Sequence, residues 1–275
     1  MIQKPGFIAL FILIPLTAVL RVTQLMYMID PDTLFYKSQY AGVGAVFGVC
    51  LFAAAVLLIL LGRTGGGCEP KAPEKSGALA VLSLLMGVGV AVQAALTINA
   101  YAGDNSGSGD PLASVILLTL LAAGSLWYFL REAYACRGGG RPGAMVALCP
   151  ALYFMVQLVT LFVRYTGIAN ISESMFDMGL YVLLMLFFLL RARVGSDIGR
   201  ERAMRWLFGF GFACALFCCL TTVPRYAVLL WGDRTVLHGS DAPSPFVLLT
   251  GVYIIVYLCG MARRPSRCDH AQEAL

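Results

Sequence analysis

Charged residues are scarce in this sequence. Asp, Glu, Lys and Arg together make up 13% of its 275 residues, whereas hydrophobic residues make up 59%. A soluble domain of this length has a smaller apolar fraction and about twice as many charges on its surface. The composition therefore excludes an ordinary water-soluble globular protein.

Histidine is almost absent. The two histidines, His238 and His270, lie in polar segments near the C-terminus. A Ser-His dyad, an HExxH zinc site or a His-dependent lipid phosphatase needs histidine inside the membrane, so we expect no enzyme of these kinds and no cofactor. We also expect His238, with Asp233 and Asp241 nearby, to be solvated rather than bound to a metal. A lipid-modifying activity that uses loop carboxylates stays open as an alternative.

Long polar segments are also lacking. The longest inner connection, 62–76, and the connection 137–142 contain glycine runs, but neither leads into the Gly-Lys-Ser/Thr sequence of a phosphate-binding loop. They are too short to form a second folded domain. We therefore expect one domain over 1–275, with no nucleic-acid partner and no output domain of its own.

Eight apolar runs fill most of the chain instead. A helix needs about 20 apolar residues to cross ~30 Å of hydrocarbon. We place the runs at 6–25, 41–62, 78–101, 111–131, 144–165, 174–192, 204–226 and 244–262. They predict an all-α, polytopic transmembrane helical bundle, in which the first run is kept rather than cleaved as a signal peptide.

The basic residues predict the orientation of this bundle. Basic loops are retained on the cytoplasmic side of a membrane. With both termini cytoplasmic, the inner segments carry 15 of the 20 Lys and Arg residues: Lys4, Arg63, Lys71, Lys75, Arg131, Arg137, Arg141, Arg191, Arg193, Arg200, Arg202, Arg205, Arg263, Arg264 and Arg267. The net charge of +5 then follows from topology.

Two residue pairs with motif spacing have structural interpretations. Gly44 and Gly48 have the spacing of a helix-packing motif, which we expect to act within the chain rather than between copies. Cys214 and Cys218 lie one helical turn apart, and we expect apolar fillers rather than a site for a soft metal. All nine cysteines fall in the spans or on the predicted inner side, which leaves no external disulfide framework.

Polar residues inside the spans follow helical spacing. Four spans that run outward in the predicted topology each carry a polar stripe on one face. The stripes are Thr17, Arg21 and Gln24; Gln93, Thr97 and Tyr101; Tyr153, Gln157, Thr160 and Arg164; and Cys214, Cys218, Thr221 and Arg225. Their polar ends converge on the outer half of the membrane. The recurring Thr-x-x-x-Arg spacing is either an internal repeat of helical hairpins or a coincidence.

This convergence predicts an outward-facing pocket for a small polar or anionic ligand, because Arg suits carboxylate and phosphate groups. Its candidate residues are Arg21, Gln24, Gln93, Asn99, Gln157, Arg164, Asp177 and Arg225. Two alternatives stay open: lipid phosphates around the arginines, or a structural salt-bridge network with Asp30, Asp32, Glu173, Asp177 and Asp233. The apolar loop 26–36 is either a lid over this pocket or an interfacial anchor.

These features predict binding or transport of a small solute. The alternative is a non-catalytic sensor or assembly subunit that signals to a membrane or cytoplasmic protein partner through the basic inner loop 191–205. The opening of the chain, Arg21-Val-Thr-Gln24 followed by Met28-Ile-Asp30-Pro31-Asp32-Thr33 and Phe35-Tyr36, resembles that of uncharacterised multi-pass bacterial proteins over about 16 residues. This resemblance implies a bacterial cytoplasmic membrane.

Overall fold

The fold is known from a computed structural model. It describes residues 4–29, 36–64, 76–103, 112–140, 142–165, 171–196, 199–231 and 244–262. Their regular structure consists of long α-helices, two short helical turns and one isolated β-bridge. The α-helices are α1 (Lys4–Thr23), α2 (Ala41–Thr64), α3 (Gly77–Gly103), α4 (Leu112–Ala135), α5 (Ala144–Tyr165), α6 (Ile171–Gly195), α7 (Arg200–Leu230) and α8 (Pro245–Ala262).

The eight helices confirm the eight apolar runs predicted from the sequence. Each contains a stretch that is long and apolar enough to cross a membrane. The helices α6 and α7 extend beyond the predicted runs 174–192 and 204–226 at both ends, because backbone hydrogen bonding continues past the last apolar residue. The chain is therefore an all-helical bundle with the dimensions of a multi-pass membrane protein.

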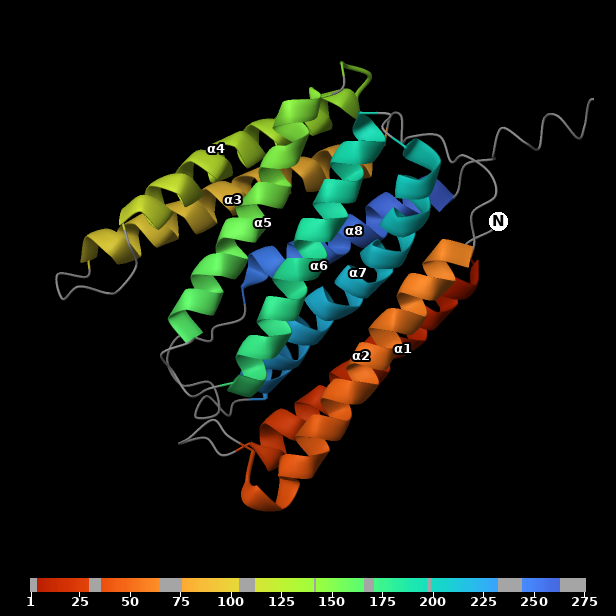
Figure 1. The fold of residues 1–275 in the computed structure, drawn as a ribbon, viewed down its shortest axis with the longest axis vertical. Coiled ribbons are helices and arrows are strands. Elements are labelled where there is room, and N and C mark those ends of the chain that lie inside the picture. Colours follow the sequence, from red (N-terminus) through yellow and green to blue (C-terminus); the bar gives the residue numbers. More distant parts are fainter. Residues whose placement is uncertain are drawn as a thin grey trace, which may run out of the picture.

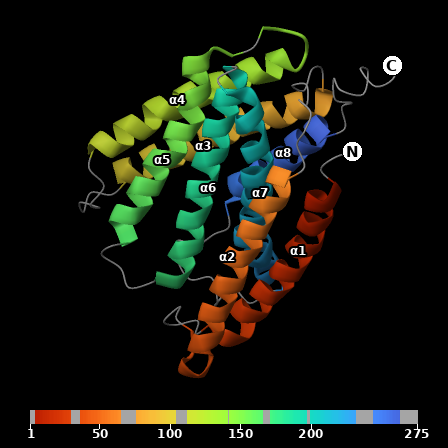
Figure 2. The ribbon, with the colours of Figure 1, turned by 45° about the vertical axis from the view of Figure 1, so that its right-hand side comes forward.

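Helix α7 is the centre of the bundle. It packs against α1, α2, α6 and α8, and 78% of its apolar window is buried, the largest share among the eight helices. The hairpin of α1 and α2 lies on one side of α7, whereas α3, α4 and α5 lie on the other (Figures 1 and 2). The two helices of this hairpin have only 22% of their apolar windows buried, so most of their apolar surface faces outward.

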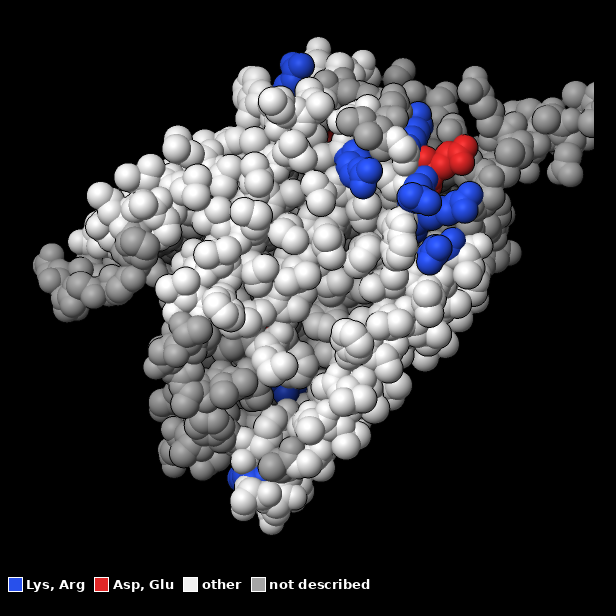
Figure 3. All heavy atoms as spheres, in the orientation of Figure 1, with Lys and Arg blue, Asp and Glu red and all other residues white. Residues whose placement is uncertain are grey.

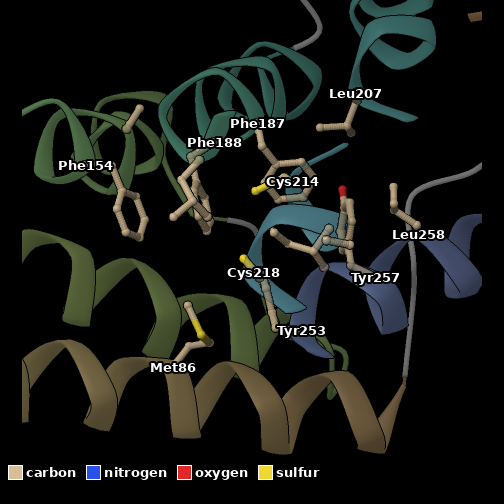
Figure 4. Packing of buried hydrophobic residues seen from close by; sticks show 14 of the residues in the cluster. Met86, Phe154, Phe187, Phe188, Leu207, Cys214, Cys218, Tyr253, Tyr257 and Leu258 are labelled. Atoms are coloured by element: carbon tan, nitrogen blue, oxygen red, sulfur yellow. The ribbon is translucent and has the colours of Figure 1, made fainter. Parts of the chain in front are cut away.

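An aromatic core fills the middle of the bundle. Phe188 of α6 stacks on Tyr253 of α8 with ring centroids 6.4 Å apart, and it meets Phe154 of α5 at 5.5 Å. Cys214 and Cys218 of α7 are fully buried beside these rings (Figure 4). They occupy the positions of small apolar fillers, so the predicted polar stripe of α7 is polar only at Thr221 and Arg225.

Helices α2 and α7 come into close backbone contact. A Cβ atom at Gly62 would lie 2.5 Å from the Cα of Gly209, and one at Gly209 would lie 2.6 Å from the carbonyl oxygen of Ile59. Only glycine permits backbones to come this close. The predicted Gly44/Gly48 motif does not pack helices: Gly44 faces the ring of Tyr36, and a Cβ at Gly48 would meet nothing within 4 Å.

The two ends of the bundle differ in charge. We call the end where α1, α3, α5 and α7 begin the basic end, and the other the distal end. Most of the described Lys and Arg side chains gather over the ends of α2 and α6 and the start of α7, with another spot near the connection of α4 and α5 and two near the distal end (Figure 3). The basic end carries Arg63, Arg131, Arg137, Arg191, Arg193, Arg200, Arg202 and Arg205, and the distal end carries Arg21, Lys37 and Arg225.

Candidate functional site

A small recess lies at the distal end of the bundle. Helix α1, the helical turn that follows it, α6 and α7 line it through Arg21, Leu25, Phe176, Leu220, Thr221 and Arg225. Its inner volume is about 10 Å³, which is room for one water molecule. Two guanidinium groups that are far apart in the sequence therefore face one opening.

Arg21 is held in place by its neighbours. One terminal nitrogen, Nη1, donates to Oε1 of Gln24 and to the hydroxyl oxygen of Tyr36, both at 3.0 Å. The Tyr36 hydroxyl donates in turn to Oε1 of Gln24 at 3.3 Å. The guanidinium also lies 4.9 Å from the ring centroid of Phe176. With only 5% of its surface exposed, Arg21 has a defined orientation.

The chain after α1 brings Tyr36 to Arg21. A π-helical turn, η1 (Gln24–Met28), follows α1, and the short 3-10 helix η2 (Ser38–Tyr40) precedes α2. Between them, Ile29 and Tyr36 form an antiparallel bridge, and the amide of Lys37 donates to the carbonyl of Met28 at 2.9 Å. The described ends of the predicted loop 26–36 thus fold back against the recess, whereas 30–35 lie outside the described residues.

Arg225 is held less tightly than Arg21. Its Nη2 lies 3.6 Å from Oδ2 of Asp177, and the two side chains are 15% and 25% exposed. A tight hydrogen bond between a guanidinium and a carboxylate is shorter, about 2.7–2.9 Å. Pro224 precedes Arg225 in α7 and has no N–H to donate to the carbonyl of Leu220 in the recess. Arg225 and Asp177 thus form a long, partly exposed ion pair, of which only Arg225 lines the recess.

The structure brings together four of the eight predicted site residues: Arg21, Gln24, Asp177 and Arg225. It places Gln93 and Asn99 on α3, whose main neighbours are α4 and α8. Gln157 lies on α5, between α4 and α6, and donates to the hydroxyl of Tyr153 at 3.2 Å. These three residues do not line the recess.

The side chain of Arg164 lies outside the described residues, as do those of Asp30, Asp32, Glu173 and Asp233. Helical face and depth, which were the basis of the prediction, do not determine which helices become neighbours. That is why the polar stripes of α3 and α5 separate from those of α1 and α7.

Sequence reasoning missed a second polar cluster, near the basic end. Glu132 of α4 pairs with Arg191 of α6, and the hydroxyl of Tyr253 of α8 donates to Glu132 at 2.8 Å. The predicted fourth span ended at Arg131, and Arg191 was placed near a loop. The signals that were available are the four-residue spacings of Tyr128 with Glu132 and of Tyr253 with Tyr257.

This Arg191 cluster (Tyr128, Glu132, Arg191, Tyr253 and Tyr257) is closed. The guanidinium carbon of Arg191 lies 4.0 Å from the ring centroid of Tyr257, 5.1 Å from that of Tyr253 and 5.7 Å from that of Tyr128. All five residues are buried. The Nη1 atom of Arg191 is buried with no hydrogen-bond partner among the described residues, and it faces a cluster made largely of aromatic rings.

Cys136 lies just beyond α4 and one turn after Glu132. Burial, and then the negative charge of Glu132, raise the pKa of this thiol to about 12. The thiol is therefore neutral at physiological pH. Among the described residues, no group of three or more His, Cys, Asp or Glu side chains has an arrangement that holds a metal ion.

Comparison with known proteins adds no relative to this picture. No family model matches the chain, and neither a curated protein nor a solved structure matches it. The geometry of the recess and of the Arg191 cluster therefore carries the functional argument.

Proposed function

We propose that this chain is a multi-pass protein of a bacterial cytoplasmic membrane that binds a small anionic solute at its distal recess. In this proposal both termini are cytoplasmic and the recess faces outward. One observation carries it: Arg21 of α1 and Arg225 of α7 line the same opening. Guanidinium groups are suited to carboxylate and phosphate oxygens, which they bind through paired hydrogen bonds.

The two arginines have different roles in this proposal. Arg21 is fixed by Gln24, Tyr36 and Phe176, so it presents a positive charge whose orientation does not change when a ligand arrives. Arg225 is paired loosely with Asp177. An incoming anion takes the place of the Asp177 carboxylate beside Arg225, and the anion and Asp177 together then offset the two guanidinium charges. Because Arg21 is already oriented, little freedom is lost when the anion binds. Because Asp177 can return to Arg225, the anion can also leave.

The size of the recess limits what it holds. Its inner volume of about 10 Å³ holds one water molecule, whereas pockets for drug-sized ligands have volumes of about 300–1,000 Å³. In this proposal an anion therefore reaches the two guanidinium groups at the mouth, once the Asp177 carboxylate has moved away from Arg225. Leu25, Phe176 and Leu220 form the apolar part of the lining.

Binding is the step that the geometry supports most directly. Passage of the solute through the bundle requires a second conformation, because the aromatic core around Phe188, Cys214 and Tyr253 separates the recess from the basic end. Transport in this proposal therefore depends on movement of helices that pack against α7.

Native mass spectrometry in mild detergent tests the binding step. We expect the wild type to retain a small anionic adduct, and Arg225→Gln to lose it while keeping the fold. Lys37→Gln is the matched control, since Lys37 is an exposed cation at the same end and does not line the recess. An adduct that persists in Arg225→Gln contradicts the proposal. So does a stable wild-type protein that retains no anion and gains no thermal stability from phosphate or acetate.

A further inference from the structure

A second surface, made of exposed arginines beside a tryptophan, lies at the basic end. Arg63 is the penultimate residue of α2, and Arg202, Arg205 and Trp206 lie in the first two turns of α7. The three arginines are exposed. We call these four residues the Arg63 surface. They belong to the region where positive charge gathers in Figure 3, and they take no part in the distal recess.

The close crossing of α2 and α7 positions this surface. Gly62 and Gly209 bring the two backbones into contact, and Trp206 lies three residues before Gly209 on α7. The guanidinium carbon of Arg63 therefore lies over the indole of Trp206, 4.9 Å from the ring centroid. Trp206 is itself stacked on Phe210 at 5.7 Å. The flat face of Arg63 thus has a fixed aromatic support, which leaves its edge donors directed away from the ring.

An apolar track leads from this charged surface toward the distal end. Residues three, seven, eleven and fourteen positions before Arg63 share its face of α2. They are Leu60, Val56, Phe52 and Val49, and all four are exposed. A charged head with a hydrocarbon strip directly below it matches the layout of a phospholipid. An acidic peptide in water would contact the arginines but would leave the apolar strip uncovered.

We infer that the Arg63 surface binds the headgroup of an anionic phospholipid whose acyl chains lie along α2. The phosphate accepts hydrogen bonds from Arg63 and Arg202, and Arg205 adds positive charge. Glu201, also exposed in the first turn of α7, opposes binding by repulsion but is outnumbered by the three arginines. A lipid bound here spans the crossing of α2 and α7, so it holds the α1–α2 hairpin against the bundle.

Lipid retention tests this inference independently of the distal recess. The purified full chain is mixed with phosphatidylglycerol or with phosphatidylcholine of the same acyl chains, and bound lipid is counted by native mass spectrometry. We expect preferential retention of phosphatidylglycerol, and about fivefold weaker binding for each of Arg63→Gln and Arg202→Gln. Arg137→Gln is the control, because Arg137 is exposed at the same end but lies on the connection after α4.

The variant Trp206→Leu tests whether the lipid binds at a site with an oriented Arg63 or is held only by general attraction between charges. It keeps every arginine but removes the aromatic support of Arg63, and we expect about threefold weaker binding of phosphatidylglycerol. Equal retention of the two lipids would overturn the inference. So would equal losses in Arg137→Gln and Arg63→Gln, or full displacement of the lipid by inorganic phosphate or by an acidic peptide.

Discussion

The Arg191 cluster and the distal recess use the same chemistry at opposite ends of the bundle. Each combines an arginine, a carboxylate and aromatic rings contributed by several helices. Around Arg191, three tyrosines and Glu132 enclose the guanidinium completely. Around Arg225, the carboxylate is 3.6 Å away and the side chains are partly exposed. The two sites therefore differ in how far they are enclosed rather than in residue type, and in our proposal only the less enclosed one binds a ligand.

The difference has an energetic basis. A buried ion pair is costly to desolvate, and removing one partner leaves an uncompensated charge in the apolar interior. A partly exposed pair is screened by water and contributes little to stability. The Arg191 cluster should therefore hold α4, α6 and α8 together, whereas the Arg225–Asp177 pair can open at little cost.

The largest expected effect compares the two carboxylates. Glu132→Gln removes the charge that balances buried Arg191, and we expect a loss of about 3–5 kcal/mol in the free energy of unfolding. Asp177→Asn acts on the exposed pair, and we expect a loss of at most about 1 kcal/mol. Unfolding in detergent, followed by circular dichroism, measures both variants. Equal losses would show that the two ends do not differ as described.

A smaller effect is expected at Tyr36. Tyr36→Phe removes the hydroxyl that bonds both Arg21 and Gln24, so Arg21 is held less firmly. We expect a loss of about 1 kcal/mol in the free energy of unfolding and anion binding about fivefold weaker. Tyr27→Phe serves as the control, because Tyr27 is exposed near the same end. Unchanged anion binding in Tyr36→Phe would contradict the role given to Arg21.

The smallest effect concerns the reactivity of Cys136. Because this residue lies next to the Arg191 cluster, its labelling shows whether the cluster is closed to solvent. With its pKa raised to about 12, the thiol has almost no thiolate form at neutral pH, and the thiolate is the reactive form. We expect Cys136 to resist a maleimide at neutral pH in the folded protein and to react once the protein unfolds. Mass mapping of labelled peptides distinguishes it from the other cysteines. Rapid labelling of Cys136 in the native state would mean that the Arg191 cluster is open.

The sequence predicts best those features that depend on residues close together in the chain. Twenty-residue apolar runs predicted all eight helices, because a membrane-spanning helix is determined by its own composition. The site was only partly predictable. Arg21 and Gln24 share one helical face, so their proximity follows from spacing. By contrast, the separation of Gln93 and Gln157 from the recess depends on the packing of α3 and α5.

The meeting of Glu132 with Arg191 and Tyr253 illustrates the same limit. These residues are brought together by the packing of three helices that are distant in the sequence. No periodicity within a single helix encodes which of its neighbours it will contact. An acid at the end of an apolar run is nevertheless a signal for a partner, and Glu132 directly follows the predicted run 111–131.

The most direct test of the account is the thermal stability of the protein titrated with inorganic phosphate and with acetate. Wild type is compared with Arg225→Gln and with Arg191→Lys. The account predicts that an anion raises the melting temperature of the wild type and of the less stable Arg191→Lys variant, and leaves Arg225→Gln unchanged. An equal rise in Arg225→Gln, or a rise abolished only by Arg191→Lys, would contradict the assignment of the distal recess as the anion site.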